Sequence, residues 1–354
     1  MSRFFSEKYA SLTPYTPGEQ PQNRKYIKLN TNESPYPPSP LAQKLAREEA
    51  GNLQLYSDPE CRGLVKTAAQ MLGVEENEIL FTNGSDEILN FAFMAFCDEQ
   101  HPAVFPNITY GFYPVFAELN HVPYEQIPLN DDFTVNVQDY MGVGKTVFLA
   151  NPNAPTGIAL TKAQIEAIVA SNPDNVVVVD EAYVDFGGES ALELIHRYPN
   201  LLVCQTFSKS RSLAGARLGF GAACKELIAD LNTVKYSTNP YNINRMTMAA
   251  GVGALADVDY FRENCEKIRK TRAWTVQELQ KLGFRMTDSR TNFLFAASDR
   301  IGGQELYLRL KERGVLVRHF ETPLLRDYNR ITVGSDEQMA AFIEILTGIL
   351  EECR

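Results

Sequence analysis

Short apolar segments alternate with helical segments between residues 41 and 245, and this alternation constrains the fold more than any other feature. The segments "KTVFLANP", "NVVVVDEAY" and "NLLVCQTFSK" are apolar at successive positions, and helical stretches such as "TKAQIEAIVASN" lie between them. A strand that faces water on one side alternates apolar and polar residues, whereas a strand covered on both sides is apolar throughout. The sequence therefore predicts an α/β fold whose mainly parallel sheet is covered by helices on both faces.

The composition of the chain changes near residues 40 and 245. The arm before residue 40 is rich in Pro, Asn and Tyr, as in "LNTNESPYPPSP", which indicates an extended segment. After residue 245 a long charged helix, "YFRENCEKIRKTRAWTVQELQKLG", precedes the strand candidates "TNFLFA", "VLVRHF" and "NRITVG". We expect an N-terminal arm at 1–40 that joins a smaller α+β domain at 246–354, and a large domain at 41–245.

Charge and cysteine usage argue against several classes of protein. The net charge of −10 and the lack of a basic run argue against a nucleic-acid surface and favour small-molecule substrates. The six cysteines form no C-x-x-C pair and the four histidines are dispersed, which argues against a disulfide framework or a metal site. No apolar run approaches the roughly 18 residues of a membrane span, and we expect a cytoplasmic protein.

Polar residues directly follow the predicted strands, at the edge where open parallel sheets bind ligands. They are Asn83-Gly84-Ser85-Asp86 after "EILFT", Asn151 and Asn153 after "TVFLA", Asp180 and Tyr183 after "NVVVV", and Thr206 to Lys209 after "LLVCQ". Taken alone, each has a structural alternative: a capped turn at "NGSDE", a proline-rich loop at "NPNAPTG" and a salt bridge at Asp180. Their common position favours one shared ligand site.

The segment "TFSKSRSLAGARLGFG", residues 206–221, carries several cations and no acidic residue. We therefore expect Lys209 and Arg217 to be neutralised by a cofactor rather than by side chains. No G-x-x-x-x-G-K-[ST] occurs, and "MGVGKTVF" lacks the third glycine of G-x-G-x-x-G and precedes its strand. The sequence thus argues against a P-loop and against a dinucleotide fold.

A single ligand with three features accounts for the whole set of residues. Its phosphate would be held by a helix N-terminus, hydroxyls and an arginine fork, at Gly84, Ser85, Asp86, Thr206, Ser208 and Arg217. Its carbonyl would bond to Lys209, and its protonated ring nitrogen would pair with the buried carboxylate of Asp180. Pyridoxal 5'-phosphate has all three features, so we predict it as the cofactor.

These segments resemble the fold-type I pyridoxal-phosphate-dependent aminotransferases over nearly the whole length, from "PYTPGEQP" to "NRITVG". Within class II of that superfamily, "KLNTNESPYPPSP", "YSDPE", "NGSDE", "DEAYVDF" and "TFSKSRSLAGARLG" are most similar to the histidinol-phosphate aminotransferase family. The resemblance implies a seven-stranded, mainly parallel sheet between helices, a smaller α+β domain and a homodimer.

The resemblance also implies a role for each matching residue. Lys209 would bond covalently to the cofactor aldehyde, Asp180 would pair with the pyridinium nitrogen, and Tyr183 would donate to the phenolic oxygen. Tyr110 would stack on the ring, and Tyr56 of the partner subunit would reach into the site. The phosphate ligands would be Ser85, Asp86, Thr206, Ser208 and Arg217.

One position departs from the family pattern. The family has an asparagine immediately before Pro-Thr-Gly, where its amide contacts the phenolic oxygen, but this chain has Ala154 there. We expect Asn153 to take over that contact, and the alternative is that Tyr183 makes it alone.

On the substrate side, the resemblance points to Tyr15 in the arm, Arg318 in "VLVRHF" and Arg330 in "NRITVG". Arg330 would clamp a carboxylate and Tyr15 would contact a substrate phosphate, with structural salt bridges as the alternative for the arginines. A planar guanidinium suits both anions, because it binds either one bidentately.

The activity implied by the resemblance is transamination of L-histidinol phosphate with 2-oxoglutarate, which gives imidazole acetol phosphate and glutamate in histidine biosynthesis. Two alternatives use the same cofactor residues. An aromatic amino-acid aminotransferase would fill a similar pocket with a phenyl ring, and a threonine-phosphate decarboxylase would use the same anion-binding arginines.

Overall fold

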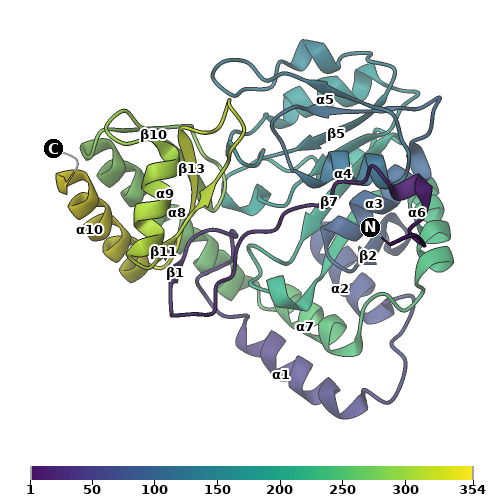
Figure 1. The fold of residues 1–354 in the computed structure, drawn as a ribbon. Helices are drawn as coiled ribbons and strands as arrows, with labels where there is room; N and C mark the ends of the chain where they lie inside the picture. Colours follow the sequence, from purple (N-terminus) through teal and green to yellow (C-terminus); the bar gives the residue numbers. More distant parts are fainter. Residues whose placement is uncertain (1, 353–354) are drawn as a thin grey trace.

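A computed structural model describes residues 2–352, and its centre is a seven-stranded sheet (Figure 1). In spatial order the strands are β2 (Ile79–Thr82), β8 (Gly219–Ala223), β7 (Leu201–Thr206), β6 (Val177–Asp180), β5 (Thr146–Ala150), β3 (Ala103–Pro106) and β4 (Tyr124–Ile127). β8 runs antiparallel to both of its neighbours, and every other pair is parallel. The predicted mainly parallel α/β sheet is confirmed.

Successive residues of the central strands point to opposite faces of this sheet, and a separate hydrophobic core covers each face. Val177 and Leu201 belong to one core, whereas Val178 and Leu202 belong to the other. The helices of the first core are α1 (Pro40–Glu49), α2 (Arg62–Leu72), α5 (Lys162–Ser171) and α7 (Arg245–Ala256). Those of the second are α3 (Ser85–Phe96), α4 (Phe112–Leu119) and α6 (Lys225–Thr238). The unbroken apolar runs in the sequence are thus explained by burial on both sides.

The C-terminal part is built on a second sheet, which lies beside the first (Figure 1). Its antiparallel order is β12 (Arg318–His319), β13 (Tyr328–Thr332), β10 (Phe293–Ser298) and β9 (Phe284–Met286). The accompanying helices are α8 (Val258–Lys281), α9 (Gly303–Glu312) and α10 (Asp336–Glu352). A separate two-stranded sheet pairs β1 (Ile27–Lys28) of the arm in parallel with β11 (Val315–Leu316). The arm therefore contacts the C-terminal part, and we propose that the two form one domain.

α7 begins at the residue where the sequence predicts the domain boundary, and it packs with the large sheet. The sequence suggested a division at residues 245 and 246, yet α7 packs against α1 and α2 and contributes Ala254 to the core of the large sheet. We propose that the division falls at the start of α8 instead. The remaining short elements are 3₁₀ helices at Glu7–Tyr9, Ala50–Asn52, Glu76–Glu78, Val137–Tyr140, Val184–Phe186, Leu192–His196 and Ala214–Ala216.

The sequence did not indicate β4 or β8, and the structure gives a reason for each. β4 is an exposed edge strand with a polar sequence, "YEQI", so it has no apolar signature. β8 contains glycines, which are depleted from strands in general. A Cβ on Gly219 would lie 2.5 Å from the backbone nitrogen of Ser85, and one on Gly221 would lie 2.8 Å from the Ile88 side chain. Glycine thus allows β8 to pass close beneath the start of α3.

Within residues 2–352, no helix is both long and apolar enough to cross a membrane, and no cluster of potential metal ligands occurs.

Candidate active site

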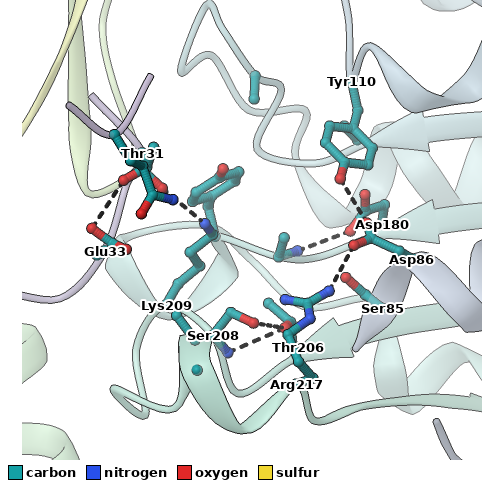
Figure 2. A pocket seen from close by; sticks show the side chains of 17 residues that line it. Thr31, Glu33, Ser85, Asp86, Tyr110, Asp180, Thr206, Ser208, Lys209 and Arg217 are labelled. Atoms are coloured by element: carbon teal, nitrogen blue, oxygen red, sulfur yellow. Dashed lines mark hydrogen bonds and ion pairs between the residues drawn. The ribbon is translucent and has the colours of Figure 1, made fainter. Parts of the chain in front are cut away.

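A cavity of about 460 Å³ lies where the carboxyl ends of β6 and β7 meet the start of α3 (Figure 2). We call it the first cavity. Most of the residues that the sequence singled out line it, namely Ser85, Asp86, Tyr110, Asp180, Tyr183, Thr206, Ser208, Lys209 and Arg217. The structure therefore brings these predicted residues together around one cavity, and their role as one binding site stays a prediction.

Lys209 lies three residues beyond the end of β7, and its side chain extends into the first cavity (Figure 2). Its ammonium group donates to the backbone carbonyl of Thr31 over 3.3 Å and lies 5.8 Å from the centre of the Tyr183 ring. Thr31 belongs to the N-terminal arm, so the arm borders the site. The only hydrogen-bond partner of this amine among the described residues is thus a neutral carbonyl, and a ligand aldehyde can reach it.

Asp180 is the last residue of β6 and is only 5% exposed. One carboxylate oxygen accepts a hydrogen bond from the Tyr113 hydroxyl over 3.3 Å, and the other accepts one from the Ala182 N–H over 3.2 Å. Burial raises the pKa of Asp180 to about 7, because water no longer stabilises the charged form. A cationic group in the first cavity would reverse this effect and keep the carboxylate ionised.

The free energy of unfolding of the cofactor-free protein should depend on pH through Asp180. Its pKa of about 7 in the folded protein exceeds the ordinary value of 3.8, so between these values the folded protein binds more protons than the unfolded chain. The stability that Asp180 contributes therefore falls as the pH rises from about 4 to about 7. Asp180→Asn stays neutral and should gain stability relative to wild type over this interval. Urea unfolding of both proteins measures this, and a pH-independent difference would contradict the assignment.

The end of the first cavity opposite Lys209 is suited to an anion. α3 begins after Gly84, which has a φ of 78°, and no side chain caps the N–H groups of its first turn. Such groups carry the positive end of the helix dipole. The Thr206 and Ser208 hydroxyls lie 3.0 Å apart on the same wall, which Ser85 also lines. Backbone and hydroxyl donors thus converge at one point, as a phosphate requires.

Arg217 lies two residues before β8, at the end of the 3₁₀ helix Ala214–Ala216, in a left-handed conformation with a φ of 54°. Its guanidinium donates to Asp86 over 2.8 Å, and the other carboxylate oxygen of Asp86 accepts a hydrogen bond from the Tyr110 hydroxyl over 2.6 Å (Figure 2). The expectation that no side chain neutralises Arg217 is therefore wrong, because the acidic partner comes from 131 positions away in the sequence. Since an ionised carboxylate only accepts hydrogen bonds, Asp86 can bind a phosphate through its backbone N–H while its side chain orients Arg217 and Tyr110.

A second cavity, of about 760 Å³, adjoins the first and shares Thr31, Tyr110, Ala154, Tyr183 and Lys209 with it. It also contains the three residues predicted to bind substrate, Tyr15, Arg318 and Arg330. Tyr15 stacks on Phe112 with ring centres 4.2 Å apart.

The two arginines of the second cavity are register partners on the adjacent strands β12 and β13. Arg330 donates to the Asn30 carbonyl over 3.1 Å, its Nε has no partner among residues 2–352, and burial lowers its pKa. Arg318 donates to the carbonyls of Thr16 and Pro17 over 3.1 and 3.3 Å. Neither arginine forms a salt bridge within the described chain, so the structural alternative to anion binding loses its support.

Comparison with known proteins decides the family. Residues 24–346 match the family model described as aminotransferase class I and II. A relative from Brachyspira hyodysenteriae named histidinol-phosphate aminotransferase is 48% identical over 353 residues, which cover 99% of this chain and 100% of the relative. The chain belongs to the class I and II aminotransferase family. The resemblance inferred from the sequence is confirmed.

Solved aminotransferases and related enzymes share the fold. The histidinol-phosphate aminotransferase of Sinorhizobium meliloti, solved in complex with pyridoxal-5'-phosphate, superposes with a TM-score of 0.91 at 24% identity, covering 100% of this chain and 99% of that one. The L-threonine-O-3-phosphate decarboxylase of Porphyromonas gingivalis gives a TM-score of 0.79 at 22% identity, covering 92% of this chain and 99% of that one. The fold alone therefore does not distinguish transamination from decarboxylation.

Three of the predicted residues, Gly84, Asn153 and Tyr56, do not line either cavity of this aminotransferase. The Asn153 amide donates to the Ile108 carbonyl and to Thr156, and its oxygen accepts a hydrogen bond from Thr109. Its hydrogen bonds are directed at the protein, so the structure does not support the predicted contact with the cofactor. Tyr56 is 80% exposed and stacks on Tyr241 outside both cavities.

Two buried residues that the sequence did not single out contact the predicted site residues of this aminotransferase. Tyr113 donates to Asp180, and Asn32 donates to the Tyr183 hydroxyl over 2.9 Å. Asn32 belongs to "LNTNESPYPPSP", which was already noted as a family motif, and Tyr113 lies three residues after Tyr110. Their contacts join positions 67 and 151 residues apart, and no local pattern reveals such pairs.

Proposed function

We propose that this aminotransferase uses pyridoxal phosphate to transfer the amino group of L-histidinol phosphate to 2-oxoglutarate, as one step of histidine biosynthesis. The observation that carries the proposal is the position of Lys209, which lines both cavities. On one side of its amine lie a buried carboxylate and an anion site at a helix terminus. On the other side lie two register-paired arginines without acidic partners. This arrangement suits a cofactor that bonds to Lys209 and an anionic substrate that approaches it from the second cavity.

The residues present fit pyridoxal phosphate. Ser85, Thr206, Ser208 and Arg217 would hold the phosphate, and Asp180 would hold the proton of the ring nitrogen. When bound, this cofactor supplies an electron-accepting ring that stabilises negative charge at the substrate carbon. The raised pKa of Asp180, about 7, is the physical support, since a buried carboxyl group gains most from a cationic partner.

Lys209 acts as the proton-transfer group. With pyridoxal phosphate and substrate bound, the free Nζ of Lys209 would be a general base that removes the proton from the substrate Cα. Asp180 would keep the ring nitrogen of the cofactor protonated during this transfer. Tyr183 and Tyr110 border both cavities, and their rings enclose the reacting carbon and exclude water.

The second cavity accounts for two different substrates. Histidinol phosphate carries a phosphate and no carboxylate, whereas glutamate carries two carboxylates. The forks of Arg318 and Arg330 bind either kind of anion. The aromatic side chains of Tyr15, Tyr110 and Phe320 line the same cavity and provide faces for the imidazole ring.

Substitution of Gly84 tests the phosphate site. An alanine Cβ would lie 2.6 Å from the Arg217 guanidinium, and the φ of 78° already disfavours any side chain. We expect Gly84→Ala to weaken binding of pyridoxal phosphate by about 10- to 100-fold, as measured by equilibrium titration. Gly215→Ala is the matched control, because Gly215 also lines the first cavity but a Cβ there meets nothing within 4 Å. Equal affinities for the two variants would exclude the proposed phosphate position.

Steady-state kinetics test the substrate. We expect kcat/KM for histidinol phosphate, with 2-oxoglutarate as acceptor, to exceed that for phenylalanine. Threonine phosphate should release no carbon dioxide. A higher kcat/KM for phenylalanine would favour the aromatic aminotransferase, and carbon dioxide release would favour the decarboxylase.

We further propose a cytoplasmic homodimer. The exposed side chains include a group of large apolar residues, which is typical of an interaction surface: Leu53, Leu55, Tyr56 and Tyr241. The first three are close in the sequence, and Tyr241 stacks on Tyr56. A second copy bound there would bring Tyr56 of the partner subunit toward this site. Sedimentation equilibrium measures the assembly, and a monomer at micromolar concentration would contradict it.

A further inference from the structure

We propose that Asn32 is a positioning residue, which directs the Tyr183 hydroxyl proton into the first cavity and makes Tyr183 the donor to the cofactor's phenolic oxygen in place of position 154. This inference rests on the proposed function, because it concerns how the site holds pyridoxal phosphate.

The hydrogen bond between Asn32 and Tyr183 has a defined direction. Asn32 is 1% exposed, and its amide Nδ2 donates to the Tyr183 hydroxyl oxygen over 2.9 Å. A hydroxyl has one proton and accepts through its lone pairs. Because Asn32 occupies a lone pair, the Tyr183 proton is directed elsewhere, and Asn32 is the only hydrogen-bond partner of this oxygen within residues 2–352. Tyr183 lines both cavities, so its proton is available there to a ligand.

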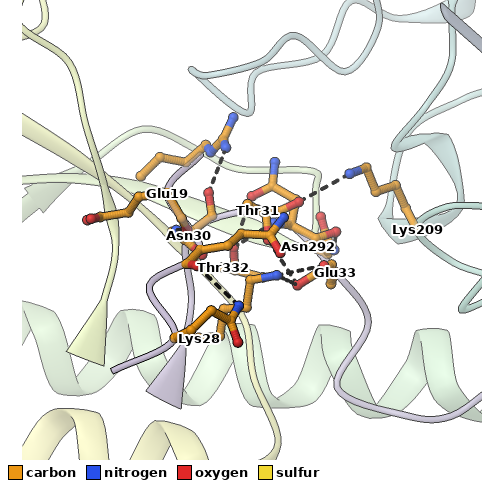
Figure 3. Close-up of polar contacts among 12 residues, drawn as sticks. Glu19, Lys28, Asn30, Thr31, Glu33, Lys209, Asn292 and Thr332 are labelled. Carbon is orange, nitrogen blue, oxygen red and sulfur yellow. Dashed lines mark hydrogen bonds and ion pairs between the residues drawn. The ribbon is translucent and has the colours of Figure 1, made fainter. Parts of the chain in front are cut away.

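The orientation of the Asn32 amide is itself fixed by its neighbours. The Thr332 hydroxyl accepts from the Asn32 backbone N–H over 3.0 Å and donates to Asn32 Oδ1 over 3.0 Å. The Asn292 amide donates to the Asn32 carbonyl over 3.0 Å, and Figure 3 shows Thr332 and Asn292 beside the arm. With its oxygen engaged by Thr332, the amide presents only its NH₂ group to Tyr183. Hydrogen bonds thus run in one direction, from Thr332 through Asn32 to Tyr183.

The ring of Tyr183 is also held in place. It meets Phe293 edge to face, with ring centres 5.1 Å apart at 89°. The hydroxyl oxygen can therefore move little, and rotation of its proton is the freedom that Asn32 removes.

No competing donor stands where the sequence led us to expect one. Ala154 lies in the same buried cluster as Tyr183 and lines both cavities, but it offers only a methyl group. The neighbouring Asn153 directs its amide to Ile108 and Thr156. Among these residues, Tyr183 alone can donate to a phenolic oxygen placed beside Ala154.

The role predicts a spectroscopic effect that does not depend on turnover. A hydrogen bond to the phenolic oxygen stabilises its negative charge, and that charge in turn stabilises the proton on the nitrogen that joins the cofactor to Lys209. Weakening the donor leaves more charge on the oxygen, so the pKa of that nitrogen should rise. The visible absorption band of the bound cofactor reports this pKa directly.

The experiment is a pH titration of that band in variants reconstituted with pyridoxal phosphate. Asn32→Gly removes the amide and tolerates the left-handed φ of 56° at this position. We expect it to raise the apparent pKa by about one unit, and Tyr183→Phe to raise it by at least as much. Asn32→Gly added to Tyr183→Phe should give no further shift. Asn30→Ala, which removes another buried amide of the arm that bonds to Glu19, should leave the pKa unchanged.

Ala154→Asn provides a rescue, because a second donor beside the phenolic oxygen should return the pKa of the Asn32→Gly protein toward the wild-type value. The inference is overturned if Asn32→Gly leaves the pKa unchanged while Tyr183→Phe raises it. It is also overturned if Asn32→Gly raises the pKa equally in the Tyr183→Phe background, or if Ala154→Asn gives no rescue. Absence of any visible band in the wild-type protein would instead refute the proposed function.

Discussion

Lys209→Ala should reduce transamination by about 10⁴-fold or more, because the variant lacks both the covalent anchor and the general base. The chain should still fold and bind pyridoxal phosphate non-covalently. Its phosphate ligands lie on α3, at and just after the end of β7, and before β8, and none of them forms a hydrogen bond with the Lys209 amine. Purified variant protein would be assayed with histidinol phosphate and 2-oxoglutarate, and its bound cofactor would be measured after gel filtration.

The matched control for this variant is Lys28→Ala. Lys28 pairs with Glu33 in the arm, close to the site, but it lines neither cavity (Figure 3). Its removal also takes one positive charge from this region, and the loss of a partly exposed ion pair should change kcat by less than about 10-fold. Steady-state turnover by Lys209→Ala, or an equal loss in both variants, would refute the role of Lys209.

Asp180→Asn should lower kcat by about 10³-fold, because a neutral amide cannot hold a proton on the ring nitrogen in this buried position. Folding should be preserved, since an amide can satisfy both present contacts. Its oxygen can accept from the Ala182 N–H, and its NH₂ group can donate to the Tyr113 hydroxyl. Single-turnover kinetics would measure proton removal from the substrate apart from product release.

Glu181→Gln is the control for Asp180→Asn. Glu181 is the next residue, it is buried, and burial raises its pKa to about 7 as well. Its carboxylate accepts hydrogen bonds from Ser190, Ala191 and Gln205, and it lines neither cavity. We expect Glu181→Gln to affect stability more than proton transfer. A comparable loss of single-turnover rate in both variants would show that burial of a carboxylate, and not its position, matters.

The parts of the fold that the sequence predicted are those whose signals are local. The strands β5, β6 and β7 are apolar at almost every position, and the polar residues that follow them mark the binding edge of the sheet. β8 was missed because it contains glycines, which are needed where the strand passes close to α3. That contact is visible only in the folded chain. Local composition therefore predicted the sheet and its helical layers, but not the close contact between β8 and α3.

The candidate site shows the same division. Asp180 and Lys209 could be predicted because they lie at or shortly after the ends of apolar strands, and Arg217 because it follows Lys209 in the same recognisable segment. Their partners could not, since the Arg217 contact to Asp86 spans 131 positions and the Asn32 contact to Tyr183 spans 151. The cofactor contact expected of Asn153 stays a prediction, although the amide donates to Thr156 and to the Ile108 carbonyl, 45 positions away in the sequence.

We propose that Lys209 carries pyridoxal phosphate, and that the amino group of histidinol phosphate passes to this cofactor. The most direct test is the visible spectrum of the reconstituted wild-type protein, recorded before and after stoichiometric histidinol phosphate is added without 2-oxoglutarate. We expect a visible band that is lost on addition, release of one equivalent of imidazole acetol phosphate, and recovery of the band when 2-oxoglutarate follows. A band that histidinol phosphate leaves unchanged, or a protein that binds no cofactor, would contradict it.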